Sequence, residues 1–335
     1  MKSIRYFFFV AFLAILIEIV IRLSGIYATY AEANFDRYES LYNQARPIYY
    51  YEWRKDSVSY DQAEFSITCK VNNFSLRDNK DFKTDTLDHY KILFLGDSFT
   101  EGVGASCGKN LPETFQKLLK DSITVYNGGV LGADPFYYLK WYDEKFHVLE
   151  PQEVFIVLNY SDISDYIFRG GDERFIGGDS TLSKPAPKIE WWYKNFHTVR
   201  FIAHFVFQYD YTLLLPEAFE KQSDEAIIAI ANKINEWSFR HPELKLSVVI
   251  HPYAFSYSKN VPGHNKMPEL RTFFNKNIDF INLYPNFASL LQKENYLDYS
   301  WKIDGHFNDK GYDFFAQELW TEWQKQNIID IKKSE

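Results

Sequence analysis

The chain has 335 residues, of which 46% are hydrophobic and 24% are charged. This composition is typical of a folded protein with ample apolar material for a core. The formal net charge of -8 argues against a nucleic-acid-binding protein, which would need a basic face. Aromatic residues make up 19% of the chain, which indicates either a large aromatic core or surfaces that stack on sugars.

An apolar run follows two basic residues near the N-terminus. Lys2 and Arg5 precede Tyr6–Val20, which is broken by a single glutamate. With its flanks, the run has about the length that spans a bilayer. The basic flank predicts a cytoplasmic N-terminus and a body outside the cytoplasm, in the periplasm or at the cell surface. We therefore expect a transmembrane anchor over residues 1–26. The alternative is a cleaved signal peptide, with an A-x-A pattern at 31–33.

The segment after the anchor is polar and aromatic. Residues 27–90 contain short alternating pieces such as Glu64–Val71, which predict an irregular extension with a few strands. Cys69 and Cys107 are the two cysteines of the chain, and the sequence leaves open whether they form a disulfide or remain buried thiols. Cysteine and histidine nowhere have the spacing of a zinc site, so we expect no metal.

From Lys91 onward, predicted strands alternate with predicted helices. The strands are expected at 91–97, 122–129, 153–162, 244–253 and 278–285. The helices are expected at 111–121, 134–149, 224–240 and 309–324. This alternation predicts a mainly parallel five-stranded sheet in a three-layer α/β/α sandwich over residues 91–330, with an aromatic helical insertion at about 163–222. Ligands of such sheets bind at the carboxyl ends of the strands.

A serine follows the first predicted strand, in the stretch LGDSFTEGVG, Leu95–Gly104. The position places the Ser98 hydroxyl at the carboxyl edge of the sheet, on a turn with glycines on both sides. A serine hydroxyl is a weak nucleophile until a base removes its proton. If Ser98 is a nucleophile, we therefore expect a base at the same edge of the sheet.

Two of the eight histidines are candidates for this base. His251 lies at the end of the fourth predicted strand. His306 lies in WKIDGHFNDKGY, directly before the last predicted helix, and Asp304 is two residues earlier. Such an aspartate can bond one imidazole nitrogen and leave the other free for the serine. We therefore predict that His306, oriented by Asp304, is the base for Ser98.

These motifs resemble the blocks of the SGNH, or GDSL-type, hydrolase superfamily. GDSFTEG is similar to the first block, and DGHFNDKG is similar to the last block in a shorter D-x-H form. Val125–Pro135 is similar to the second block, which implies that the Gly132 amide binds the oxyanion together with the Ser98 amide. The resemblance covers about residues 90–326 and implies a flavodoxin-like SGNH fold with no cofactor. The stretch Val71–Phe82 also resembles a run that precedes the catalytic domain in membrane-anchored members.

The third block departs from the family pattern. The family usually has G-x-N-D after the third strand, and the asparagine side chain donates to the oxyanion. This chain has Asn159-Tyr160-Ser161-Asp162, so Ser161 stands where the asparagine is expected. Asn159 is the alternative donor. One oxyanion donor contributes about 10²–10³ in rate, so the departure affects efficiency more than reaction class.

Together with the predicted anchor, the resemblance implies a membrane-anchored, extracytoplasmic serine esterase with a Ser98, His306 and Asp304 triad. The expected substrate is an acyl ester, with O-acetyl groups on an envelope polysaccharide as the expected natural target. Two alternatives stay open. The same serine would serve an O-acetyltransferase of envelope glycans, whereas a degenerate SGNH domain would only bind glycan. The sequence identifies no protein partner and no oligomeric state.

Overall fold

The structure, a computed structural model, describes residues 2–24, 56–82, 90–119, 123–175, 189–207, 216–252 and 264–334. The chain divides into two compact units. The larger contains Ile48–Ile167 and Ser223–Glu335, and the smaller contains Met1–Pro47 and Phe168–Gln222. The A-x-A pattern at 31–33 lies outside the described residues.

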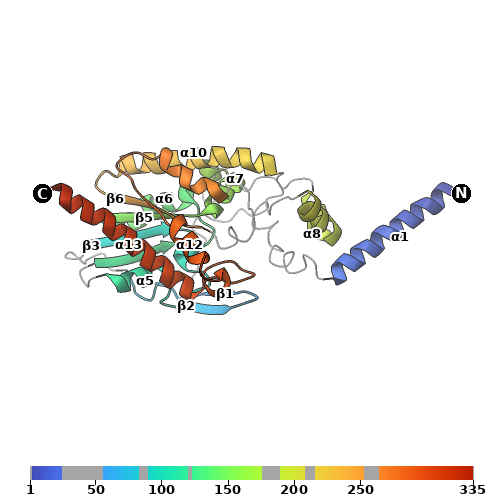
Figure 1. The fold of residues 1–335 in the computed structure, drawn as a ribbon, viewed down its shortest axis with the longest axis horizontal. Helices are drawn as coiled ribbons and strands as arrows, with labels where there is room; N and C mark the ends of the chain where they lie inside the picture. The colour runs from blue at the N-terminus through green and yellow to red at the C-terminus, as the bar shows by residue number, and fades with distance from the viewer. Residues whose placement is uncertain are drawn as a thin grey trace. The chain divides into compact units, whose positions relative to one another are not determined.

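The larger unit is built on a five-stranded parallel sheet (Figure 1). Its strands are β3 (Tyr90–Gly96), β4 (Ile123–Gly129), β5 (Glu153–Leu158), β6 (Lys245–Ile250) and β7 (Asp279–Asn282). The strand order is β4-β3-β5-β6-β7, and every neighbouring pair is parallel. In order of appearance this is the 2-1-3-4-5 arrangement of flavodoxin-like folds. The predicted fold class is therefore confirmed.

Helices cover both faces of the sheet (Figure 1). One layer contains α5 (Leu111–Leu118), α12 (Tyr284–Leu291) and α13 (Asp309–Ser334). The other contains α6 (Pro135–Glu144) and α10 (Pro216–Arg240), which pack together where the rings of Tyr142 and Trp237 meet at 4.9 Å. Further helices are α4 (Ser98–Glu101), α7 (Tyr160–Arg169), η2 (Phe146–Leu149), η3 (Gly171–Phe175), η5 (His264–Thr272) and η6 (Tyr296–Asp298).

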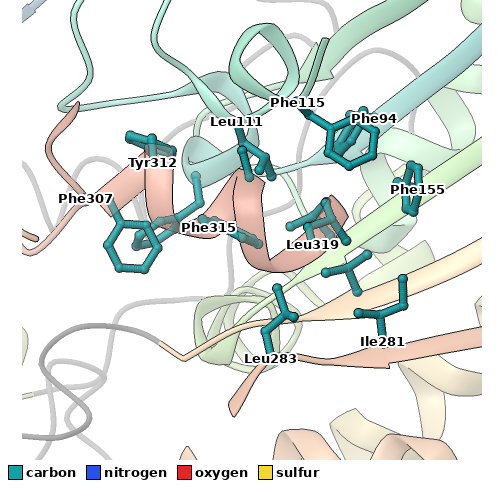
Figure 2. Close-up of a cluster of buried hydrophobic side chains, with 14 of the residues drawn as sticks. Phe94, Leu111, Phe115, Phe155, Ile281, Leu283, Phe307, Tyr312, Phe315 and Leu319 are labelled. Atoms are coloured by element: carbon teal, nitrogen blue, oxygen red, sulfur yellow. The ribbon is translucent and has the colours of Figure 1, made fainter. Parts of the chain in front are cut away.

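An aromatic core joins the sheet to α5 and α13 (Figure 2). Phe94 of β3 and Phe155 of β5 stack with ring centroids 4.8 Å apart, and Phe115 of α5 packs edge-on against both. Phe315 and Leu319 of α13 complete the cluster. Each such side chain contributes about 1.5–3 kcal/mol by its burial. This core therefore fixes the positions of β3 and β5, whose carboxyl ends lie at the candidate site.

The third predicted strand was expected to reach residue 162, and this expectation is wrong at its end. β5 stops at Leu158, and α7 begins at Tyr160. The Asn159 side chain accepts a hydrogen bond from the Ser161 backbone N–H at 2.8 Å. Asp162 accepts one from the Asn159 backbone N–H at 2.8 Å. These side-chain to backbone bonds turn the chain into a helix directly after the strand.

The N-terminal extension contributes an antiparallel hairpin to the larger unit. It consists of β1 (Ser57–Asp61) and β2 (Ser66–Lys70). Its buried residues Val58, Tyr60 and Phe65 pack in a small cluster with Val103. A disulfide joins Cys69 of β2 to Cys107 in the loop after α4. The structure thus settles the question that the sequence left open for the two cysteines.

The smaller unit contains α1 (Lys2–Leu23), α8 (Glu190–Asn195), α9 (His197–Phe201) and the π-helical turn Ile202–Val206. Glu18 of α1 accepts hydrogen bonds from the backbone N–H groups of His197 and Thr198, both at 2.9 Å. It also accepts one from the Thr198 hydroxyl at 2.7 Å. Glu18 thereby satisfies the free N–H groups at the start of α9.

Among the described residues, one helix segment, Ile4–Leu23, is long and apolar enough to cross a membrane. Its mean hydropathy is 2.4, and none of it is buried inside the protein. A signal sequence near an N-terminus has the same length and composition. The segment therefore fits either a membrane anchor or a signal sequence.

Candidate active site

Ser98 lies where β3 ends and α4 begins, at the carboxyl edge of the sheet. Asp97 caps this short helix, because its side chain accepts a hydrogen bond from the Phe99 backbone N–H at 2.9 Å. Ser98 retains 7% of its surface in solvent, whereas its neighbours Asp97 and Phe99 are more deeply buried. Ser98 is therefore less deeply buried than the residues on either side of it.

His306 and Asp304 reach Ser98 from the loop before α13. The Nε2 atom of His306 lies 2.7 Å from the Ser98 Oγ atom. Its Nδ1 atom lies 2.6 Å from Asp304 Oδ1. A carboxylate only accepts, so Nδ1 carries the proton and donates to Asp304, which leaves Nε2 to accept from the serine hydroxyl. The structure thus joins the three predicted residues in one hydrogen-bonded chain.

The surroundings of Asp304 favour its charged form. Burial alone would raise the pKa of Asp304, but the hydrogen bonds and charge of His306 outweigh burial and lower that pKa below its ordinary value of 3.8. The imidazole of His306 packs on the ring of Phe99, with centroids 4.7 Å apart. The histidine is therefore held from one side by a carboxylate and from another by an aromatic ring.

The other candidate histidine has a different environment. His251 follows β6 and is fully buried, and its Nδ1 atom donates to the Pro252 carbonyl at 3.1 Å. Burial lowers the pKa of His251 to about 3, so the ring is neutral at ordinary pH. It packs against Phe99, Phe307 and Phe315. His251 is a core residue beneath the site.

Asn159 and Ser161 converge on Asp97. The Asn159 Nδ2 atom donates to Asp97 Oδ2 at 2.8 Å, and the Ser161 Oγ atom lies 2.8 Å from the same oxygen. Ser161 Oγ also lies 2.7 Å from Asn159 Oδ1. Burial raises the pKa of Asp97 above 3.8, and these hydrogen bonds act in the opposite direction. Because the Ser161 hydroxyl has one proton, it must turn away from Asp97 and Asn159 to reach an oxyanion.

Gly132 lies in the turn after β4, the strand that pairs with β3. Its φ of 69° is in the left-handed region, which glycine adopts without strain. The turn is tied to β3 because the Val130 N–H donates to the Gly96 carbonyl at 3.0 Å. A side chain at Gly129 would lie 2.1 Å from the Glu101 backbone nitrogen, so only glycine allows α4 to sit this close to β4.

Three polar residues contact the backbone around the site and were not predicted from the sequence. The buried Arg77 donates to the carbonyls of Gly102 and Ala105, in the loop after α4. Arg77 lies in the stretch Val71–Phe82, and this stretch is the feature of the sequence that could have pointed to it. Glu101 accepts from the Leu131 backbone N–H, next to Gly132. Glu64 accepts from the backbone of the loop that carries Asp304. No local pattern in the sequence marks Glu64.

Within the described part of the chain, no group of three or more His, Cys, Asp or Glu side chains is arranged to hold a metal ion.

No protein-family model and no curated protein matches the chain. Solved structures with a similar chain course include an acetylxylan esterase, Axe2, from Geobacillus stearothermophilus, at 15% identity and a TM-score of 0.43, covering 70% of this chain and 93% of that one. A lipase/acylhydrolase from Enterococcus faecalis has 14% identity and a TM-score of 0.41, with coverage of 70% and 96%.

A putative acylhydrolase from Bacteroides fragilis has 16% identity and a TM-score of 0.38, with coverage of 71% and 88%. These identities and TM-scores are too low to transfer an activity or a substrate.

Proposed function

We propose that the chain is a serine esterase of the SGNH type. One observation carries the proposal: Asp304, His306 and Ser98 form a continuous hydrogen-bonded chain at the carboxyl edge of a parallel sheet. This is the arrangement of acid, base and nucleophile in acyl-transfer enzymes, and it is recognised by geometry and not by position in the sequence. The altered third block leaves this chain of contacts intact.

The reaction follows from the contacts. Ser98 Oγ attacks the ester carbonyl carbon as its proton passes to His306 Nε2, and the negative charge of Asp304 stabilises the imidazolium that results. The tetrahedral intermediate collapses, the C–O bond to the alcohol breaks, and His306 returns the proton to the leaving oxygen. Water then attacks the acyl-Ser98 ester with His306 as base, which releases the acid and restores the serine.

Backbone amides at the strand ends are the proposed oxyanion donors. The Ser98 backbone N–H makes no hydrogen bond to another described residue, so it is available to a substrate oxygen. The second proposed donor is the N–H of Gly132, on the turn beside the end of β3. Ser161 and Asn159 remain proposals for a third donor. Each donor would contribute roughly 10²–10³ in rate.

We also propose that α1 anchors the body outside the cytoplasm. The Cys69–Cys107 disulfide supports an oxidising compartment, because disulfides are rare in the cytosol. The bonds from His197 and Thr198 to Glu18 support an uncleaved helix, since cleavage after α1 would remove the acceptor that caps α9. Mass spectrometry of membrane-extracted protein tests this: an intact N-terminus supports the anchor, and a start near residue 34 contradicts it.

The test of the esterase assignment is turnover of p-nitrophenyl acetate by the full chain in detergent. Ser98→Ala should lower the rate by at least roughly 10³-fold without changing the circular dichroism spectrum. Ser106→Ala, an exposed serine in the following loop, is the matched control and should leave turnover unchanged. Wild-type turnover by Ser98→Ala would contradict the proposal. Esters of graded acyl length and acetylated polysaccharide then test the expected O-acetyl substrate.

A further inference from the structure

The turn of the β1–β2 hairpin contacts the loop that carries Asp304 and His306. The two carboxylate oxygens of Glu64 accept hydrogen bonds from three consecutive backbone N–H groups, those of Lys302, Ile303 and Asp304, at 3.0, 2.6 and 3.0 Å. Successive N–H groups aimed at one anion form a backbone nest. One side chain from the N-terminal extension thus sets the backbone conformation directly at the acid of the proposed triad.

The same loop is held at its start by an aromatic contact. The ring of Phe65, next to Glu64, lies 5.1 Å from the ring of Trp301. The Trp301 Nε1 atom donates to the Gly104 carbonyl at 2.9 Å, in the loop that follows the nucleophile helix. The hairpin therefore supports the loop at two adjacent points, residue 301 and residues 302–304.

A second path runs from the hairpin to the proposed oxyanion donor. The Tyr60 hydroxyl of β1 donates to Glu101 Oε1 at 2.5 Å. The other oxygen of this carboxylate accepts from the Leu131 backbone N–H, immediately before Gly132. Glu101 is fully buried, so these contacts form away from competing water. Tyr60 and Glu101 together hold the position of the Gly132 turn.

We propose that the β1–β2 hairpin is a positioning element of the active site: Glu64 holds the Asp304–His306 loop, and Tyr60 holds the Gly132 turn through Glu101. This proposal rests on the esterase function proposed above. Catalysis needs nucleophile, base and oxyanion donors in register, and a misplacement of about 1 Å can cost roughly 10²-fold in rate. The β1–β2 hairpin then contributes to catalysis from outside the α/β sandwich, through the Asp304–His306 loop and through Glu101.

The experiment compares Glu64→Ala, Glu64→Gln and Tyr60→Phe with Asp61→Ala in the full chain. Asp61→Ala removes the same charge from an exposed position of the same hairpin and is the control. Three quantities are measured: kcat and KM for a short ester, the melting temperature, and the low-field proton NMR signal of the His306 Nδ1–H. The NMR signal reports the His306–Asp304 hydrogen bond whether or not the chain turns over an ester.

Glu64→Ala should lower kcat roughly 10- to 100-fold with little change in KM, and should shift or abolish the low-field signal. Glu64→Gln keeps one acceptor oxygen, so its kcat should be intermediate, and it serves as the second variant if Glu64→Ala does not fold. Tyr60→Phe should lower kcat and leave the low-field signal in place, because it acts on the oxyanion side. Asp61→Ala should match the wild type in all three measurements.

The proposal is overturned if the Glu64 variants keep wild-type kcat and the wild-type low-field signal, even when their melting temperature falls. That outcome would make Glu64 a purely structural residue. Failure of the esterase function looks different: the wild type would then show no turnover that depends on Ser98. In that case the low-field signal of the Glu64 variants still reports whether the hairpin holds Asp304 against His306.

Discussion

Removal of the Cys69–Cys107 disulfide should destabilise the larger unit and loosen the hairpin. The two cysteines are separated by 38 residues. The disulfide closes a loop and so lowers the chain entropy of the unfolded state. For a loop of this length, this stabilises the folded state by about 4 kcal/mol, a factor of about 10³ in the folding equilibrium. The Cys69→Ser/Cys107→Ser double variant should therefore unfold at a markedly lower urea concentration than the oxidised wild type.

The assay is urea unfolding of the full chain in detergent, followed by near-ultraviolet circular dichroism, with and without a thiol reductant. Reductant should shift the wild-type midpoint toward that of the double variant, and it should leave the double variant unchanged. Equal midpoints for oxidised wild type, reduced wild type and double variant would refute this reasoning. Such a result would mean that the hairpin is held by Val58, Tyr60 and Phe65 without help from the disulfide.

Three further predictions concern single side chains. Asp304→Asn should lower kcat by about 10⁴-fold, because the amide no longer fixes the His306 tautomer; retention of more than a tenth of the wild-type kcat would exclude Asp304 as the orienting group. Ser161→Ala should lower kcat, and Ser161→Asn should preserve or raise it. If Ser161→Ala has unchanged kinetics and Asn159→Ala is severely impaired, the third oxyanion donor is Asn159 instead of Ser161. Burial raises the pKa of Asp78 from 3.8 to about 7, so its ionisation makes folding less favourable as pH rises through that interval. Asp78→Asn should remove up to about 4 kcal/mol of this pH-dependent loss of stability. The measurement is the unfolding free energy at several pH values between 4 and 8. An unchanged pH dependence would contradict the raised pKa of Asp78.

The sequence predicts the sheet and the three residues of the proposed triad because their signals are local. Apolar strands followed by amphipathic helices specify a parallel sheet, and the motifs at Ser98 and His306 each lie directly after or before a predicted element. The carboxyl edge of the sheet then brings them together without knowledge of any loop. The end of β5 was missed because Asn159 and Asp162 turn the chain through side-chain bonds that the apolar pattern does not report.

The contacts around the proposed triad could not be predicted from the sequence for a different reason. Glu64 and Asp304 are 240 positions apart in the sequence, and Tyr60 and Glu101 are 41 apart. Each bond depends on the register of the hairpin against the sandwich, which no local pattern encodes. The same holds for the Ser161 hydroxyl, whose partner Asp97 is 64 positions away. Its engagement with Asp97 depends on side-chain geometry that only the structure provides.

The most direct test of the central claim is covalent labelling with diisopropyl fluorophosphate, followed by peptide mass spectrometry. Attack by Ser98 Oγ forms the O–P bond, fluoride leaves, and His306 takes the serine proton. We expect a single adduct on Ser98 in the wild type and none in a folded His306→Ala variant. An adduct on another residue, or equal labelling of Ser98 without His306, would contradict it.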